Sequence, residues 1–225
     1  MFFRIIFCVG LLLLAACSTA RMEFDPDLEV NSESYLISER PDTFSGGDLV
    51  FGPYRATRIN RGFISKTGES TLGYSSKNVE QNYSFHFKGQ SNWEGECIVD
   101  SGNLEYRIIS GGYFADMHCS FVPADKGSKV AMGWHIDIVG ETSGTARGAI
   151  VVGSEAIEVA AVNKTEGSGL RLSQHTGYYF YLDGNIVAGV DTISHEGPVW
   201  LNRQLTMDEK DIIGLVVVAL LLNQV

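Results

Sequence analysis

Ile212-Ile213-Gly214-Leu215-Val216-Val217-Val218-Ala219-Leu220-Leu221-Leu222 decides the fold of this chain, because the run has no polar face. A helix that is apolar on every side must be buried or lie in a membrane. About 11 residues make a helix of roughly 16 Å, too short for the ~30 Å hydrocarbon core of a bilayer. We therefore expect a helix enclosed by its own domain. A buried terminal strand is the alternative, given the β-branched Val216 to Val218.

The residues before this run predict where the helix begins. Thr206 is a favoured N-cap residue, and Glu209 follows three positions later, as in a capping box. Asp208, Glu209 and Asp211 fall in the first turn, where the helix dipole favours negative charge. We expect the helix to start at Thr206.

From Asp48 onward the chain alternates apolar and polar residues, the pattern of antiparallel strands. Asp183-Gly184-Asn185 predicts a hairpin turn, and Gly46-Gly47, Gly111-Gly112 and Gly167-Ser168-Gly169 predict loops. About a dozen strands in one domain predict a sandwich or a closed barrel. For residues 46–225 we expect a mainly β fold: a closed antiparallel β-barrel of about twelve strands around the buried C-terminal helix. The predicted strands are Leu49–Phe51, Tyr54–Ile59, Tyr83–Phe87, Trp93–Val99, Leu104–Ile109, Asp116–Phe121, Trp134–Ile138, Ala149–Val152, Ile157–Val162, Tyr178–Leu182, Ile186–Val190 and Val199–Leu201.

The first residues have the pattern of an export signal. Arg4 precedes a short apolar stretch that ends in Leu14-Ala15-Ala16-Cys17. These four residues resemble the bacterial lipobox, which implies cleavage after residues 1–16 and a diacylglyceryl group on Cys17. An ordinary signal peptide with a chance cysteine is the alternative. In Gram-negative lipoproteins an aspartate after the cysteine tends to retain the protein at the inner membrane, so Ser18 favours the outer membrane for a Gram-negative source.

Residues 17–45 are expected to form a lipidated tether. Pro26 and Pro41 interrupt regular structure there, and acidic side chains repel one another, namely Glu23, Asp25, Asp27, Glu29 and Glu33. Such a segment would hold the folded domain away from the membrane.

Two cysteines, Cys97 and Cys119, remain after the signal and the lipid site are set aside. In an oxidising compartment they predict a disulfide. A pair of free buried thiols is the alternative. A metal site at His118 and Cys119 is disfavoured, because adjacent strand residues point to opposite faces, and no metal or cofactor is expected.

The strands, the Tyr179–Gly189 hairpin and the acidic start of an apolar C-terminal helix resemble the tubby-like superfamily. That group includes the LURP-one-related proteins and the phospholipid scramblases, and the resemblance implies a twelve-stranded barrel enclosing a hydrophobic helix. Tubby domains bind phosphoinositides through basic residues. The corresponding candidates are Arg55, Arg58 and Arg61, which would meet lipid phosphate or lipopolysaccharide. An ordinary solvated face, with Asp48 and Glu69 nearby, is the alternative. Scramblases have a calcium site near this helix, but here Asp208, Glu209 and Asp211 are more simply helix N-terminal charges.

Charge and motifs narrow the function. Without Arg4 the chain has 16 basic and 27 acidic residues, a formal charge near −11, which opposes nucleic acid as a partner. The sequence has no catalytic motif, and its five histidines are scattered. Several aromatic residues are candidates to line a ligand groove: Trp93, Trp134, Trp200 and Tyr178–Tyr181. We expect a non-enzymatic envelope lipoprotein with a binding or structural role, held at the membrane by its N-terminal lipid. The alternatives are a lipid-binding module and a hydrolase whose site assembles only in three dimensions.

The lipobox interpretation predicts the outcome of one substitution. Cys17→Ala removes the acceptor thiol, so the variant should incorporate no radiolabelled palmitate in cells. Cys8→Ala, which changes a cysteine inside the signal, should be labelled like the wild type. Normal labelling of Cys17→Ala would refute the anchor.

Overall fold

The apolar run is a helix, not a strand. In the computed structural model, helix α3 (Met207–Leu222) contains it, and every residue from Asp211 to Leu222 is buried. The structure describes residues 20–41, 46–62, 65–71, 74–106, 109–124, 134–141, 145–152, 155–168, 171–172 and 174–223. Within these ranges no helix has the length and apolarity needed to cross a membrane. The signal at residues 1–16 and Cys17 lie outside them.

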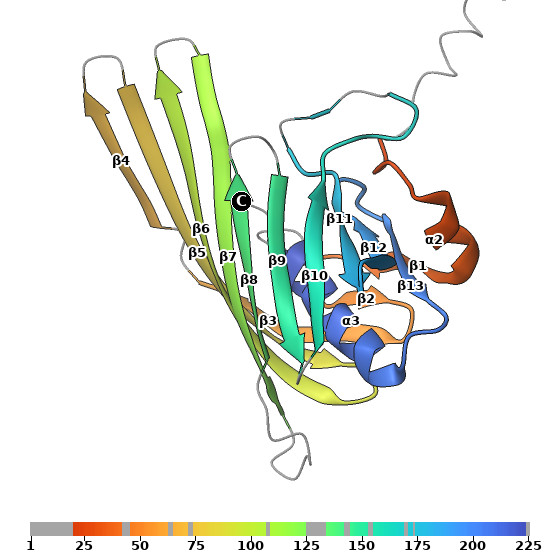
Figure 1. The fold of residues 1–225 in the computed structure, drawn as a ribbon. Coiled ribbons are helices and arrows are strands. Elements are labelled where there is room, and N and C mark those ends of the chain that lie inside the picture. Colours follow the sequence, from red (N-terminus) through yellow and green to blue (C-terminus); the bar gives the residue numbers. More distant parts are fainter. Residues whose placement is uncertain are drawn as a thin grey trace, which may run out of the picture.

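The rest of the described chain is mainly antiparallel β-structure with one further helix, α2 (Figure 1). Most of the strands predicted from alternation are present, because each contributes one apolar face to a common core. The elements are α2 (Pro26–Asn31), β1 (Ser32–Glu39), β2 (Leu49–Phe51), β3 (Tyr54–Arg61), β4 (Ser65–Thr71), β5 (Tyr74–Lys88), β6 (Asn92–Tyr106), β7 (Ile109–Pro123), β8 (Trp134–Glu141), β9 (Thr145–Val152), β10 (Glu155–Val162), β11 (Gly177–Leu182), β12 (Asn185–Asp191) and β13 (Pro198–Asn202), before α3.

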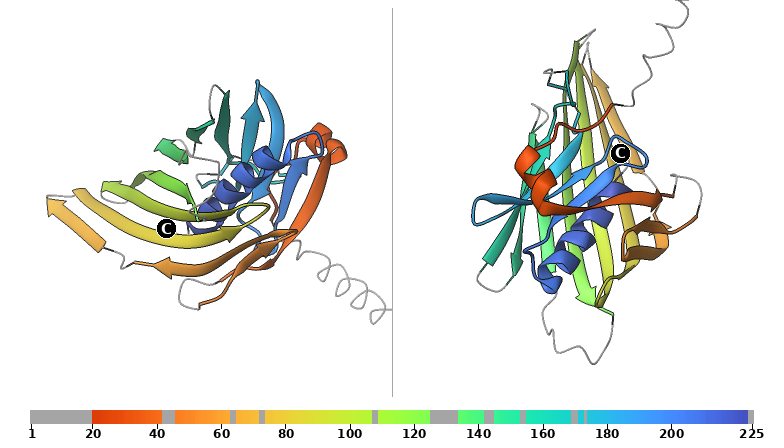
Figure 2. Two further views of the ribbon diagram at one scale, coloured as in Figure 1. Left: turned by 90° about the horizontal axis from the view of Figure 1, so that it is seen from below. Right: turned by 90° about the vertical axis from the view of Figure 1, so that its right-hand side faces the viewer.

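The strands form a single sheet in the order β3-β2-β1-β13-β12-β11-β10-β9-β8-β7-β6-β5-β4. Strand β3 pairs with β2 along one edge and with β5 along the other. The sheet curves strongly, and α3 lies against its concave face (Figure 2). Strands β5, β6 and β7 are the longest, and with β4 they project beyond the part of the sheet that holds the helix (Figure 1).

The core lies between the concave face and α3. Alternate residues of the strands point inward, so the period-two pattern of the sequence becomes one continuous apolar cluster with the helix. The inward side chains include Tyr83, Phe85, Phe87, Cys97, Val99, Met117, Cys119, Phe121, Ile150, Ile157, Val159, Phe180, Val190, Val199 and Leu201.

The N-terminal end of α3 has the predicted capping box. Thr206 Oγ1 accepts from the Glu209 amide at 3.3 Å, and Glu209 Oε2 accepts from the Thr206 amide at 2.6 Å. One turn later, the buried Asp211 carboxylate accepts hydrogen bonds from the amides of Gln90 and Ser91, at 3.1 and 2.9 Å. These amides belong to the turn between β5 and β6, so Asp211 fixes the helix to that turn. A Cβ atom at position 89 would collide with the Asp211 carboxylate, so the turn needs Gly89 there.

The C-terminal end of α3 receives donors from the sheet. Tyr83 on β5 donates to the Ala219 carbonyl at 2.7 Å, and Arg40 Nη2 donates to the Leu221 carbonyl at 3.2 Å. Both acceptors belong to the last turn of the helix, and the Ala219 carbonyl also accepts from the Asn223 amide at 3.1 Å, so Tyr83 is its second donor. Burial raises the pKa of the Tyr83 phenol, which therefore stays a neutral donor.

The expected tether at residues 17–45 is wrong for its described part. Pro26 begins helix α2 instead of breaking structure, because proline is favoured in the first helical turn and Asp25 caps the helix by accepting from the amides of Asp27 and Leu28. Strand β1 follows, and it pairs with β13 and β2. The acidic residues of β1 are not buried, and Glu33 lies 3.6 Å from the Lys210 ammonium of α3, so their charge does not prevent pairing. Residues 17–19 and 42–45 lie outside the described residues.

Two smaller predictions also differ from the structure. Leu104–Ile109 is not one strand, because β6 ends at Tyr106 and β7 begins at Ile109. Gly111-Gly112 lies within β7 and not in a loop, at the register shift between β6 and β7, and glycine is common at such bulges. The hairpin prediction is confirmed: Asp183 and Gly184 both have positive φ, 51° and 76°, between β11 and β12.

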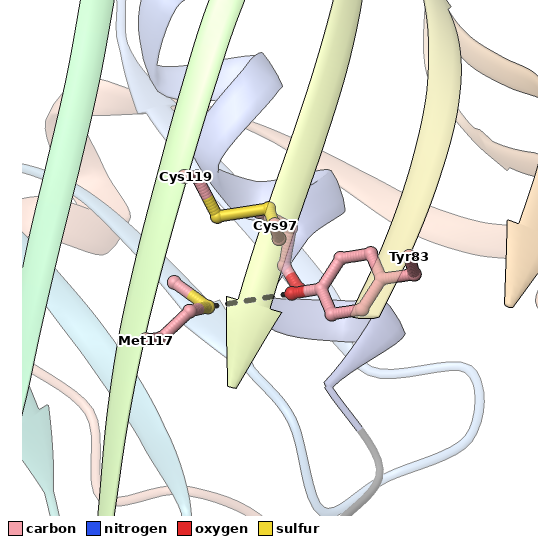
Figure 3. The surroundings of a disulfide bond; sticks show 5 residues. Tyr83, Cys97, Met117 and Cys119 are labelled. Carbon is pink, nitrogen blue, oxygen red and sulfur yellow. Dashed lines mark hydrogen bonds between the residues drawn. A yellow bond between two sulfur atoms is a disulfide. The ribbon is translucent and has the colours of Figure 1, made fainter. Parts of the chain in front are cut away.

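Cys97 and Cys119 are opposite each other on β6 and β7 and form a disulfide (Figure 3). Their Cα atoms are 4.1 Å apart. Both side chains are buried, and the neighbouring Met117 sulfur accepts a hydrogen bond from the Tyr83 hydroxyl. His118, which lies between Met117 and Cys119 in the sequence, is exposed, so adjacent residues of this strand do point to opposite faces. Among the described residues no group of potential metal ligands is found.

The disulfide predicts a measurable stabilisation. The bond joins residues 22 positions apart, and closing such a loop contributes about 3 kcal/mol in the chain-entropy model. The double variant Cys97→Ala/Cys119→Ala should lose about that much unfolding free energy in guanidinium titrations. Dithiothreitol should lower the unfolding free energy of the wild type, because it reduces the disulfide, and should leave that of the double variant unchanged. A variant as stable as the oxidised wild type would contradict this.

The Asp211 hydrogen bonds predict a second loss of stability. Asp211→Ala removes the charged acceptor of two part-buried hydrogen bonds, which should cost about 1–3 kcal/mol of unfolding free energy. Asp208→Ala is the matched control, because Asp208 is exposed in the first turn of the same helix. It should cost less than about 1 kcal/mol, the usual size of a helix-dipole effect. Equal losses in chemical denaturation would show that Asp211 acts only through helix charge.

Candidate functional site

A groove of about 530 Å³ lies over β9, β10 and β11. Helix α3 occupies the concave side of the sheet, whereas the charged groups of this groove face solvent. Its lining residues are Arg147, Gly148, Ala149, Glu158, Val159, Ala160 and Tyr181.

Strand register explains why the surface is hollow here. Ile157 and Val159 point into the core, so their neighbours Glu158 and Ala160 face outward. Arg147 pairs with Ala160, and Ala149 pairs with Glu158. Two alanines therefore form the floor of the groove diagonally between longer side chains, and a small side chain leaves room above the sheet.

The third wall comes from β11. Tyr181 is directly opposite Glu158 and is half-buried. Burial raises the pKa of the Tyr181 phenol, the Arg147 guanidinium lowers it, and the carboxylates of Asp25 and Glu158 raise it. The phenol is thus neutral, and both a cation and an anion lie close to it.

These groups supply three kinds of contact. Arg147 presents a fork of donors that suits a carboxylate, and Glu158 presents acceptors for hydroxyl or amino groups. The Tyr181 ring offers an apolar face. A few polar groups around an apolar contact are typical of small-molecule sites, and 300–1,000 Å³ is their usual size.

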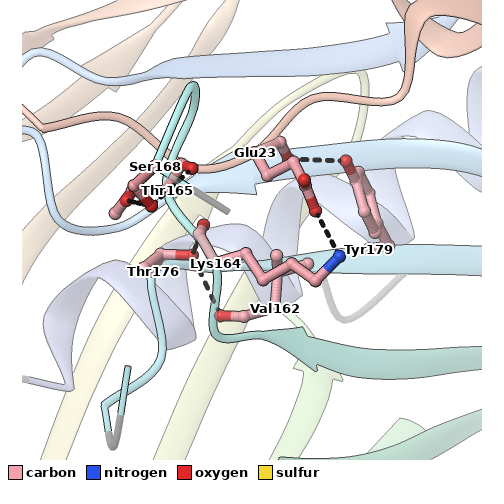
Figure 4. Close-up of polar contacts among 7 residues, drawn as sticks. All are labelled: Glu23, Val162, Lys164, Thr165, Ser168, Thr176 and Tyr179. Atoms are coloured by element: carbon pink, nitrogen blue, oxygen red, sulfur yellow. Dashed lines mark hydrogen bonds and ion pairs between the residues drawn. The ribbon is translucent and has the colours of Figure 1, made fainter. Parts of the chain in front are cut away.

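The N-terminal segment packs against the adjoining end of the same strands (Figure 4). Tyr179 on β11 donates to the Glu23 carbonyl at 2.8 Å, and Lys164 Nζ lies 3.0 Å from a carboxylate oxygen of Glu23. Thr176 Oγ1 donates to the carbonyls of Val162 and Lys164. These contacts fix the connection between β10 and β11, and so fix the two strands that form the groove.

The three arginines named from the sequence lie elsewhere, on β3. Arg55 forms an ion pair with Asp48 at 2.6 Å, Arg61 donates to the Pro41 carbonyl, and Arg58 has the positive φ of 51° at a register shift of the strand. In the sheet order, β3 is separated from the groove by β2, β1, β13 and β12. Binding of lipid phosphate by these arginines stays a prediction.

Only one aromatic residue of the predicted set lines the groove. Tyr178 and Phe180 are buried, whereas Tyr179 and Tyr181 alternate to the outer face. Trp93 is in the core, and Trp200 is buried against Phe24. The side chain of Trp134 lies outside the described residues.

Sequence reasoning missed Arg147 and Glu158. The available signal was weak: Arg147 stands between Ala146 and Gly148, and Glu158 occupies one polar position between Ile157 and Val159. Of the histidines, His86 lies 3.7 Å from Glu94 on neighbouring exposed positions, and burial lowers the pKa of the half-buried His175. Neither lines the groove.

Comparison of the chain with protein-family models, with curated proteins and with solved structures gave no match. The lipobox and the tubby-like resemblance therefore remain predictions from the sequence.

Proposed function

We propose that this protein is a lipid-anchored, non-enzymatic envelope lipoprotein whose β-domain binds a small carboxylate-bearing saccharide in the groove over β9–β11. The groove carries the proposal, because Arg147, Glu158 and Tyr181 present a carboxylate donor fork, a hydroxyl acceptor and a ring face around a floor of alanines. A pyranose carboxylic acid has the three complementary features.

The architecture supports an external site. We infer that the sheet closes into a barrel, since β3, one end of the strand order, pairs with β2 and also with β5, which lies next to β4 at the other end. Such closure around a hydrophobic helix is what the tubby-like resemblance implies. Side chains of α3 fill the interior, so a ligand has to be recognised on the outside. The lipid-handling alternative rests on the resemblance alone.

The anchor is supported by the sequence of the export signal. Leu14-Ala15-Ala16-Cys17 supplies the lipobox, and Ser18 favours the outer membrane. The Cys97–Cys119 disulfide is consistent with this location, because disulfides form and persist in oxidising compartments such as the bacterial periplasm.

Calorimetry tests the ligand class. Glucuronate titrated into the full-length protein in detergent should bind, and glucose, which lacks the carboxylate, should bind at least tenfold more weakly. Arg147→Ala should weaken glucuronate binding about tenfold to a hundredfold, because a hydrogen bond to a charged group contributes about 1.5–3 kcal/mol.

Arg55→Ala is the matched control, since Arg55 is also an exposed strand arginine but lies outside the groove. It should bind glucuronate like the wild type. Two results would contradict the proposal: no binding of glucuronate at millimolar concentration, or equal binding by Arg147→Ala and Arg55→Ala.

A further inference from the structure

The described chain contacts the domain from Ala20 onward, three residues after the proposed lipid site. Ser194 Oγ donates to the Ala20 carbonyl at 3.1 Å, and the Glu166 amide donates to the Arg21 carbonyl at 2.9 Å. The Met22 amide donates to the buried carboxylate of Asp191. Two connections of the sheet, β10–β11 and β12–β13, therefore hold the start of the described chain.

Apolar packing makes this attachment firm. Met22 is completely buried, and it packs so closely on Gly177 that a Cβ atom there would collide with the Met22 sulfur. The Phe24 ring lies 3.5 Å from the Trp200 ring, centre to centre. Leu28 of α2 completes this small cluster. Burying a methionine or leucine side chain contributes about 1.5–3 kcal/mol, so the segment is not a loose arm.

Three segments meet around Ala20, and we call them the anchor rim: residues 20–23, residues 164–168 with 171–172, and residues 192–196. The Glu23 amide donates to the Lys164 carbonyl, and the Ser194 hydroxyl donates to the Ala20 carbonyl, so residues 20–23 contact both other segments. The rim contains two exposed large apolar residues, Leu172 and Ile193, with exposed fractions of 40% and 39%.

The charge of the rim differs from that of the whole protein. Apart from His195, its ionisable side chains are three basic and three acidic, whereas the mature chain carries 16 basic (Lys and Arg) and 27 acidic residues. An anionic bilayer therefore repels the rim less than it repels the rest of the surface. The six side chains are Arg21, Lys164, Arg171, Glu23, Glu166 and Glu196.

We propose that the anchor rim is a membrane-contacting surface, with Leu172 and Ile193 in the headgroup region of the bilayer. The inference rests on the proposed lipidation of Cys17. Three residue steps separate Cys17 from Ala20, and an extended chain covers at most about 10 Å over that distance. The lipid therefore holds the rim within about 10 Å of the interface, where exposed apolar side chains gain by insertion.

This contact also orients the groove. Glu158 lies four residues from Val162, where β10 ends beside the rim, and that is about 13 Å along a strand. The groove thus opens close above the membrane. The far ends of β4–β7 lie on the same side of the molecule as the rim (Figures 1 and 2), so they limit how the domain tilts.

Fluorescence in vesicles tests the contact. Full-length protein carrying Leu172→Cys or Ile193→Cys is labelled with a polarity-sensitive dye and reconstituted into phosphatidylethanolamine–phosphatidylglycerol vesicles. Both labels should shift to shorter wavelength, and lipids with a nitroxide at a shallow acyl position should quench them.

Met207→Cys is the control, because Met207 is 56% exposed and begins α3 at the end opposite the rim. Its label should behave as in water. If the protein floats with the vesicles but the labels at 172 and 193 match that at 207, the rim inference is wrong and the anchor stands. If Cys17 is not acylated and the protein does not float, the anchor and the rim inference fail together.

Discussion

The structure depends on hiding the surface of one helix from water. Helix α3 is apolar on all sides, so a single sheet face cannot cover it, and the strands have to curve around it. Apolar burial alone does not fix the rotation or the axial position of α3 relative to the sheet, because turning or sliding the helix exchanges one apolar residue for another. Polar contacts at its ends supply the missing specificity. Asp211 binds the β5–β6 turn, and Tyr83 and Arg40 bind carbonyls of the last turn. Each of these groups is worth more as a positioning contact than as a source of net stability, since a buried hydrogen bond replaces one to water.

Helix α3 covers the concave face of the sheet, so the proposed ligand site lies on the outer face. The strand register there decides which side chains are neighbours. Ala149 and Ala160 create space only because Arg147, Glu158 and Tyr181 stand beside them on three adjacent strands. No one strand contains the groove. The same strands carry core residues on their inner face, so the site rests on a rigid support, which reduces the entropy cost of binding.

The sequence predicted what local chemistry decides. The capping box at Thr206 and Glu209 and the Asp183-Gly184 turn follow from residue types in short patterns. The pairing of Cys97 with Cys119 was predicted because these two cysteines alone remain after the export signal and the lipid site are set aside. It failed where one residue has two meanings: Pro26 was interpreted as a breaker, but after the N-cap Asp25 it starts a helix. It also failed at the groove, because the pairing of Glu158 with Tyr181 spans the long β10–β11 connection and no local pattern encodes it.

The correction at the N-terminus changes the proposed physiology of the site. A flexible tether over 28 residues (18–45) would have a root-mean-square length of about 30 Å, and the groove would sample many heights and directions. Because β1 and α2 are folded onto the sheet, only the three residue steps from Cys17 to Ala20 separate the proposed lipid from the domain. These span at most about 10 Å. The proposed anchor and the proposed binding groove then share β10 and β11, so under this proposal the ligand binds at a fixed place near the lipid surface. A ligand that is itself close to the membrane meets that groove at a higher local concentration than one free in bulk solution, which compensates for the modest affinity of an open, solvated site.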